Sequence, residues 1–559
     1  MALHTKRLLH LFFFFGVIYP LTSLDFSSKI PNEQLVEELL DSMTDEDILG
    51  QVFMLGYMGE TASEVIMDWI TEKKIGGIKI FGWNANDLSV LADTIGNMQD
   101  GALNTEFKIP LIIATDQEGG WVRHIKGETS ITPGNLALGA SGIPYDSYMT
   151  GLYIGQELRR LGINMNFAPT VDVYLNPLAD VIGPRAFSQD PIQTGSLGTA
   201  FFKGMEEAAV ISTAKHFPGH GNADEDSHGT LPVIPSTLDF LESHDLIPYK
   251  MMIKEGLPAI MVGHLAFPNI TENMKPASLC PIFLKDILRD EMNYEGLVIT
   301  DDLVMQGARY NNRSLPEVCE TALRAGSDIL LISRNPDVHE EIWQYLIKLM
   351  KVDPGFAQDV RTAASRVLKI KAKYLKRPDH VPFHPSSVGI KEDIPGRDSK
   401  EFFFGQAARS TTLVRQSVIP VPFNSTALIC GLYSDFRRQG EAMFEGSSLK
   451  IPYSFDNNEK WDVISRIRQR AEDYDFIIFS LSRYQDLYIL KELEDLAEKI
   501  IVLSSLTPVY LNDLPWVRDA VAVYGSGKDS YQSGFAAIRG DFFPRGRLPV
   551  DFIHDLHAQ

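Results

Sequence analysis

Cysteine is scarce in this chain. Only Cys280, Cys319 and Cys430 occur among 559 residues, and so sparse a set excludes a disulfide framework and implies no zinc cluster. Basic residues are also in deficit, because 73 Asp and Glu face 52 Lys and Arg and leave a formal charge of -21 at pH 7. That charge argues against a nucleic-acid binder, which carries a clustered basic surface. A neutral or small partner fits the composition better.

The N-terminal apolar run is short for a membrane span. Lys6 and Arg7 precede it, it covers about residues 8–19, and the small polar residues Thr22 and Ser23 follow. This pattern predicts a signal peptide over residues 1–24, and therefore export to the periplasm or the medium. An uncleaved N-terminal membrane anchor is the alternative, because no Ala-x-Ala cleavage pattern is present. No cysteine follows the run, which argues against a lipid-modified N-terminus.

Short apolar segments alternate with helical patterns through residues 25–376. Eight of them follow one another as VFMLG, GGIKIFG, PLIIATD, INMNFAPTVDV, VISTAKHF, AIMVGHLAF, GLVITDD and DILLIS. Eight such units predict a (β/α)8 TIM-like barrel. Ahead of them, residues 32–51 have the apolar spacing of a helix, with Thr44 and Asp47 placed as a capping pair.

The last third of the chain predicts a second, smaller domain. Residues 377–400 are rich in Pro, Ser and charge without a period, which predicts a linker. In residues 401–559, the strand-like runs TALICGLY, YDFIIFSL, KIIVLSS and DAVAVYG alternate with helical patterns. We expect an α/β sandwich domain with a mostly parallel sheet.

Polar residues stand at the carboxyl ends of six of the predicted barrel strands. In a barrel these ends open onto one face, where active sites are built. A single strand-end carboxylate is more often a helix cap, but six in register favour a functional site. The residues are Asp116, Asp172, Lys215 with His216, His264, Asp301 and Asn335.

Residues 215–232, KHFPGHGNADEDSHGTLP, concentrate histidines and acidic groups in one predicted loop. His216 and His220 have the spacing of two ligands on a helix, but the Pro-Gly pair between them opposes a helix and so disfavours a metal site of that kind. Further on, Asp226 and His228 can form a dyad in which the carboxylate orients the imidazole that moves the proton. Alone, such a pair is more often a surface turn.

The segment GLVITDDLVMQGA brings two carboxylates to the same face of the barrel. We assign Asp301, directly at the strand end, to chemistry and Asp302 to support as a cap of the following helix. A carboxylate and a proton-transfer group are the minimum for cleaving a glycosidic bond through a covalent intermediate. Charged groups suited to holding sugar hydroxyls are Asp116, Arg185, Lys215 and His216.

The segments KHFPGHGNADEDSHGTLP, ATDQEGG, NFAPTVDV, IGPRAFSQDP and ITDDLVM together resemble glycoside hydrolase family 3, in its β-N-acetylglucosaminidase branch. The resemblance runs in order from about residue 33 to 552. It implies that Asp301 is the nucleophile and that His228, assisted by Asp226, transfers the proton. It also implies that sugar hydroxyls are bound by Asp116, Arg185, Lys215 and His216.

One position departs from the family pattern. DQEGG is commonly followed by a pattern that ends in a sugar-contacting Arg, and the equivalent residue here is His124. Arg123 lies one residue earlier, and a shift of one residue in an extended stretch points a side chain to the other face. Either Arg123 serves after a loop shift, or His124 makes a weaker, pH-dependent contact.

We therefore expect an exo-acting, retaining β-N-acetylhexosaminidase that removes terminal N-acetylglucosamine from peptidoglycan fragments or related glycans. It would act as a monomer on a small carbohydrate substrate, without metal or organic cofactor and without nucleic acid. Phosphorolysis of the same bond is one alternative, because a histidine repels incoming phosphate less than a carboxylate does. Others are a non-catalytic sugar binder and a metal-dependent barrel hydrolase that uses His216, His220, His264 and Asp301.

Overall fold

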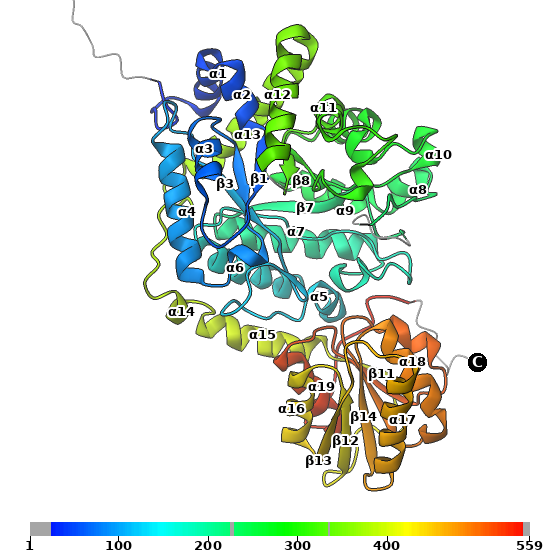
Figure 1. Ribbon diagram of the computed structural model, residues 1–559. Coiled ribbons are helices and arrows are strands. Elements are labelled where there is room, and N and C mark those ends of the chain that lie inside the picture. The colour runs from blue at the N-terminus through cyan, green and yellow to red at the C-terminus, as the bar shows by residue number, and fades with distance from the viewer. Residues whose placement is uncertain (1–23, 224–228, 334–335, 552–559) are drawn as a thin grey trace, which may run out of the picture.

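A computed structural model of the protein describes residues 24–223, 229–333 and 336–551 (Figure 1). The predicted signal peptide therefore lies almost wholly outside the described residues and stays a prediction. Across the described ranges, no helix combines the length and the hydropathy needed to cross a membrane.

The chain enters the barrel through two short helices, α1 (Asn32–Ser42) and α2 (Asp45–Gln51). The predicted capping pair separates them. The Asp47 N–H donates to the Thr44 hydroxyl, and the Asp47 carboxylate accepts from the Thr44 N–H at 3.0 Å. This reciprocal arrangement satisfies amide groups that a helix start leaves without partners.

Eight parallel strands form a nearly closed barrel in the part of the chain that the structure describes. Their order is β10-β1-β2-β3-β6-β7-β8-β9, and a bridge between Ile299 and Ile329 links the two outer strands. Because helices cover such a sheet and its strands are buried on both sides, the strand sequences are nearly continuous apolar runs. The predicted TIM-like barrel is confirmed. The strands are β1 (Phe53–Gly56), β2 (Gly77–Lys79), β3 (Ile112–Thr115), β6 (Met165–Asn166), β7 (Ile211–Phe217), β8 (Ala259–Val262), β9 (Leu297–Thr300) and β10 (Leu330–Ile332).

Helices surround this barrel, and a small hairpin interrupts the alternation after β3. The hairpin pairs β4 (Gln117–Gly119) with β5 (Val122–Arg123) in antiparallel fashion. Helix-forming segments follow or precede each strand: α3 (Glu64–Thr71), α4 (Leu88–Leu103), α5 (Asn135–Ser141), α6 (Pro144–Arg160), α7 (Pro191–Glu207), α8 (Leu238–Ser243), α9 (Leu246–Lys254), α10 (Pro268–Thr271), a π-helical segment (Ile282–Glu291), α11 (Leu315–Ala325), α12 (Pro336–Val352) and α13 (Pro354–Leu375).

The second domain is the predicted α/β sandwich. Among its described residues, six strands have the order β11-β16-β15-β14-β12-β13, and only β11 runs antiparallel. Successive residues of β12 point to opposite layers: Leu428 and Cys430 pack toward α17 and α18, and Ala427 and Ile429 toward α16 and α19. Figure 1 shows these two helical layers on either side of the sheet.

Two strands of this sheet were not predicted. β11 is short, and the edge strand β13 has the sequence EGSSLK, with one apolar side chain, so neither shows a periodic apolar pattern. The elements are α15 (Arg397–Ser410), β11 (Thr412–Arg415), β12 (Thr426–Gly431), α16 (Ser434–Met443), β13 (Glu445–Lys450), α17 (Asn457–Ala471), β14 (Phe476–Leu481), α18 (Leu487–Leu490), β15 (Ile500–Ser504), β16 (Asp519–Ala522) and α19 (Lys528–Arg539).

The two domains share an apolar cluster and an ion pair. Barrel side chains around Ile182 and Tyr174 pack with Val509 and Tyr524 of the second domain. The Arg409 guanidinium donates to both carboxylate oxygens of Asp146 on α6, at 2.8 and 3.0 Å. The expected linker, residues 377–400, contains the short helix α14 (Ile390–Asp393) and the start of α15, and the predicted limits at residues 24, 376 and 400 stay predictions.

Candidate active site

A cavity of about 460 Å³ lies at the carboxyl ends of the barrel strands. It brings together six of the residues predicted from sequence, which come from four separate stretches of the chain. They are Asp116, His124, Arg185, Lys215, His216 and Asp301. His228 and Asp226 lie outside the described residues, so their predicted roles stay predictions.

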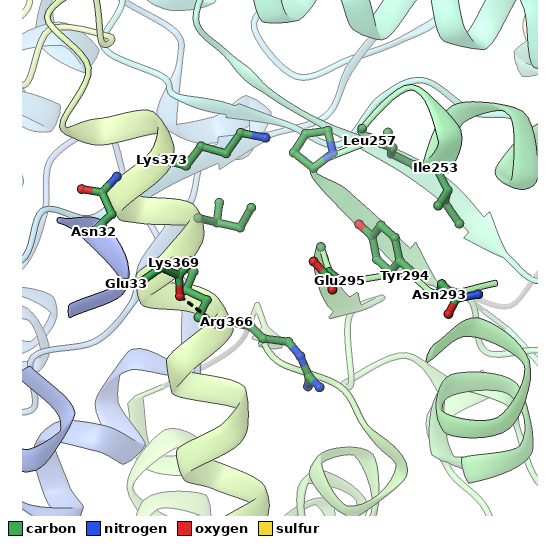
Figure 2. A pocket seen from close by; sticks show the side chains of 14 residues that line it. Asn32, Glu33, Ile253, Leu257, Asn293, Tyr294, Glu295, Arg366, Lys369 and Lys373 are labelled. Carbon is green, nitrogen blue, oxygen red and sulfur yellow. Dashed lines mark ion pairs between the residues drawn. The ribbon is translucent and has the colours of Figure 1, made fainter. Parts of the chain in front are cut away.

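A second cavity, of about 510 Å³, lies at the opposite end of the barrel, where strands β8 and β9 begin (Figure 2). Figure 2 shows α13 presenting Arg366, Lys369 and Lys373 toward it, with Lys369 paired to Glu33 at 3.3 Å. Active sites in barrels of this kind form at the carboxyl ends of the strands. The chemistry therefore belongs to the first cavity.

Asp116 joins two lysines at the bottom of the first cavity. Its Oδ1 lies 2.5 Å from Lys215 Nζ, and its Oδ2 lies 2.5 Å from Lys79 Nζ. All three residues are buried. Burial alone would raise the pKa of Asp116, but the charges of Lys215 and Lys79 outweigh it and hold the pKa well below its usual range.

Glu118 extends this network to Arg185. Its Oε1 lies 2.6 Å from Lys215 Nζ and 2.8 Å from Arg185 Nη2, and its Oε2 accepts from Arg185 Nε at 2.9 Å. The guanidinium thus binds the carboxylate through two parallel hydrogen bonds, which fixes its plane. Burial opposes ionisation of Glu118, yet the Arg185 and Lys215 charges lower its pKa to about 2.

Asp172 holds the turn that carries the two histidines of the HFPGHG segment. Its Oδ2 is 2.8 Å from His216 Nδ1, and its Oδ1 accepts the backbone N–H groups of His216 and His220 at 3.1 and 2.7 Å. Arg185 Nη2 lies 3.3 Å from His216 Nε2. Because a guanidinium can only donate, Nε2 is the acceptor, and Nδ1 carries the proton that Asp172 accepts.

Asp301 follows β9 directly and lines the same cavity. Its Oδ1 accepts the N–H of Asp302 at 2.8 Å. Burial would raise the pKa of Asp301, but its electrostatic interactions with His216 and His264 and the hydrogen bond from the Asp302 N–H outweigh burial and lower the pKa from its ordinary value. The carboxylate is therefore ionised at neutral pH and available as a nucleophile.

Asp302 supports the loop in a way that differs from the prediction. We expected it to cap a helix, but its Oδ1 accepts the N–H groups of Val304 and of Ser333, both at 3.2 Å. It therefore ties the end of β9 to the end of β10. His264 is also structural, because its Nδ1 lies 2.7 Å from Ser278 Oγ and its Nε2 lies 3.1 Å from the Asp302 carbonyl. With both ring nitrogens engaged, it is unsuited to the metal site considered above.

The β4–β5 hairpin determines which of the adjacent residues Arg123 and His124 faces the cavity. His124 lines it, whereas Arg123 points away and donates to the carbonyl groups of Thr129 and Ser130, each at 3.4 Å. Burial lowers the pKa of His124; Asp116 opposes this effect, and Lys79 adds to it. The imidazole is therefore neutral at pH 7.

Sequence reasoning missed two charged residues of the cavity, Lys79 and Glu118. Asp172 was placed at a strand end but given no role. Each of the two missed residues carried a usable signal: Lys79 interrupts a buried apolar strand, where an unpaired lysine is rarely tolerated. Glu118 stands two residues after Asp116, and the period of two in extended chain puts both on one face.

A family model described as the glycosyl hydrolase family 3 N-terminal domain matches residues 43–370, more than half of the chain. The chain belongs to glycoside hydrolase family 3. This assignment confirms the family predicted from the sequence motifs.

Relatives of this family 3 protein agree with the match. Beta-hexosaminidase A of Pseudoalteromonas piscicida is 31% identical over 423 residues, which cover 68% of this chain and 69% of that protein. Beta-hexosaminidase of Thiobacillus denitrificans is 32% identical over 350 residues, covering 59% of this chain and 90% of the relative. A solved family 3 beta-N-acetylglucosaminidase from Paenibacillus sp. str. FPU-7 superposes with a TM-score of 0.82 at 26% identity, covering 92% of this chain and 100% of that chain. The protein is a glycoside hydrolase.

Proposed function

We propose that the protein removes terminal β-linked N-acetylglucosamine from peptidoglycan fragments or related glycans, with retention of the anomeric configuration. Hydrolysis of β-linked N-acetylglucosamine is supported by the hexosaminidase and N-acetylglucosaminidase relatives. The observation that carries the retaining mechanism is the ionised Asp301 carboxylate at the end of β9. It lies beside the paired charges at the bottom of the cavity, which we call the floor: Asp116, Glu118, Arg185 and Lys215.

Asp301 is the nucleophile of this proposal. Its Oδ1 is held by the Asp302 N–H, which leaves Oδ2 to attack the anomeric carbon. The sugar hydroxyls would bind to the charged floor, where Lys215 and Arg185 donate and Asp116 accepts. Because these groups already hold one another in place, they need little reorganisation when substrate enters.

The proton donor has to come from elsewhere than the floor. Asp116 and Glu118 are ionised and paired with cations; burial raises the pKa of Asp302, but its Oδ1 accepts two backbone N–H groups that tie it to the end of β10. His216 Nε2 accepts from Arg185 and so carries no proton to give. His228 lies eight residues beyond His220, whose side chain lines the cavity. We assign the proton transfer to His228, oriented by Asp226.

The proposed reaction has two steps. In the first, Asp301 Oδ2 bonds to the anomeric carbon, the glycosidic C–O bond breaks, and His228 gives its proton to the leaving oxygen. In the second, a water oxygen attacks the same carbon, the ester bond to Asp301 breaks, and His228 takes the proton of that water. Two inversions give net retention.

Three variants of the purified protein test the proposal on a chromogenic β-N-acetylglucosaminide. Asp301→Ala and His228→Ala should each lose at least about 10³-fold in kcat, while Asp290→Ala, an exposed carboxylate on the outer helical layer, should retain full activity. NMR should detect the β-anomer as the first sugar released. Release of the α-anomer would exclude the covalent intermediate. A sugar phosphate that forms only in phosphate buffer would show that the reaction is phosphorolysis and not hydrolysis.

We further propose export, supported by Lys6 and Arg7 before the apolar run of residues 8–19. Cell fractionation with N-terminal mass analysis of the mature chain tests it. A mature chain that begins near residue 25 in the periplasm or medium would support a cleaved signal peptide. An intact N-terminus in the membrane fraction would support the anchor, and an intact chain in the cytoplasm would refute export.

A further inference from the structure

Two exposed tryptophans stand beside the catalytic cavity. The chain has six tryptophans, and Trp83, Trp121 and Trp461 are 41%, 48% and 46% exposed. Trp121 lines the cavity, and Trp83 stacks on Phe81, which also lines it. An indole left in water forgoes the stabilisation that its burial would bring. One exposed indole that lines a cavity and another that stacks on a residue of its lining are typical of a binding surface.

The backbone around Trp121 is built to hold its position. Gly119 and Gly120 precede it at φ +90° and +62°, in the left-handed region where a side chain is strained. The Gly120 N–H donates to Thr132 Oγ1 at 2.9 Å, and a Cβ at position 120 would stand 3.0 Å from the Gly134 Cα. The turn is thus clamped to the loop behind it, and residue 121 is presented at its tip.

Trp83 is fixed by different contacts. Its Nε1 donates to the Tyr57 carbonyl at 2.8 Å, so the polar group of the ring is satisfied. Its ring lies 4.4 Å from that of Phe81 at an interplanar angle of 6°, and the Phe81 N–H is held by Asn84 Oδ1 at 2.8 Å. One face of the indole is covered by Phe81, and the exposed fraction belongs to the other.

The cavity therefore has a charged floor and an aromatic rim. Asp116, Glu118 and Lys215 are 8%, 1% and 2% exposed, far less than the two tryptophans. A pyranose ring offers hydroxyls at its edge and C–H groups on its faces, so the floor suits the hydroxyls of a buried sugar and the rim suits the face of a sugar outside it. With a terminal sugar on the floor and its anomeric carbon at Asp301, the leaving group has to point toward the rim.

We propose that Trp121, together with the stacked pair Phe81 and Trp83, forms a leaving-group platform that binds the pyranose ring next to the scissile bond. This inference rests on the proposed function and adds its substrate class: a glycan with at least a second sugar. Contacts to a part of the substrate that does not react raise the rate when they are completed in the transition state. Substrates with a small aglycone should therefore be poorer.

The test compares two substrates of the full-length protein: N,N′-diacetylchitobiose, with a second ring, and methyl β-N-acetylglucosaminide, without one. Trp121→Ala should lower kcat/KM for the disaccharide by about tenfold or more and for the methyl glycoside by less than about threefold. Trp83→Ala should act in the same direction, and Trp121→Phe should recover most of the loss. Trp461→Ala, an equally exposed indole on α17, is the matched control and should change neither rate.

Binding in an inactive background separates this platform from the chemistry. In the Asp301→Ala variant, calorimetry should show that Trp121→Ala weakens binding of diacetylchitobiose and leaves binding of N-acetylglucosamine unchanged. Equal losses for both ligands would place Trp121 against the buried sugar and overturn the platform, as would no loss for either. If unmodified protein hydrolysed neither substrate, the proposed function would fail while this binding comparison still decided the platform.

Discussion

Replacing Glu118 by Gln should destabilise the barrel while keeping the shape of the site. The carboxylate is 1% exposed and lies between Arg185 and Lys215. A neutral amide removes the charge that compensates these cations and turns an N–H₂ group toward at least one of them. Removing one partner of a buried ion pair is strongly destabilising, because the other charge remains buried without compensation.

The size of the effect follows from the pKa of Glu118, which the two cations lower from 4.5 to about 2. At about 1.4 kcal/mol per pKa unit, ionised Glu118 contributes about 3 kcal/mol to the free energy of unfolding at pH 7. Because the pKa is lower in the folded state, this stabilisation is present above about pH 4.5. It is lost as the pH falls from 4.5 through about 2.

Urea unfolding at pH 7 and at pH 3 measures both consequences, with Trp69 and Trp343 as reporters because both are buried in the barrel. Glu118→Gln should lower the free energy of unfolding by about 3 kcal/mol at pH 7 and flatten its decline toward acid. Glu207→Gln, at an exposed position on α7, is the control. An unchanged unfolding midpoint at pH 7, or an acid decline as steep as in the unmodified protein, would refute the ion-pair argument.

Four further substitutions examine other contacts. In steady-state assays, His124→Ala should lower kcat/KM about tenfold and Arg123→Ala less than twofold, because only His124 faces the cavity. The reverse order would mean that the hairpin shifts when substrate binds. Since burial lowers the pKa of His124 from its ordinary value, its contribution to a pH–rate profile should not change as the pH rises above neutrality. Asp172→Asn should lower kcat/KM about 10- to 100-fold, because the carboxylate that holds the His216 ring and the following turn is lost. Unchanged kinetics would mean that Asp172 does not position these groups. Arg409→Ala should lower stability by about 2 kcal/mol in calorimetry, because it strands a buried carboxylate at the domain interface, and an unaltered melting profile would show that the pair contributes nothing.

The barrel could be predicted because its strands are buried on both faces and therefore carry continuous apolar runs. β13 could not be predicted in this way, because its side chains are mostly polar although its backbone pairs with β12 over six residues. Edge pairing is a property of the backbone and leaves little trace in side-chain pattern. The 3₁₀ segment Lys491–Leu496 also lies between the strand-like runs YDFIIFSL and KIIVLSS, where the sequence predicts a helical pattern.

The candidate site also contains features that the sequence could predict and others that it could not. Residues at the strand ends were predictable, since topology brings all of those ends to one face. The partners of each residue were not, because pairings such as Lys215 with both Asp116 and Glu118 join segments about 100 residues apart. The choice between Arg123 and His124 depended on the pairing register of a hairpin whose bulge lies between positions 117 and 119. A one-residue difference in such a turn decides which side chain meets the cavity.

The clamped turn at Gly119 and Gly120 has a consequence for how this enzyme can change over evolution. The turn lies between Glu118, which belongs to the charged floor, and the side chain at position 121. Residue 121 can therefore be exchanged without disturbing the machinery that breaks the bond. New leaving-group preferences are open to this scaffold through single substitutions at the tip, and a saturation library at that one codon would be the most economical route to altered specificity.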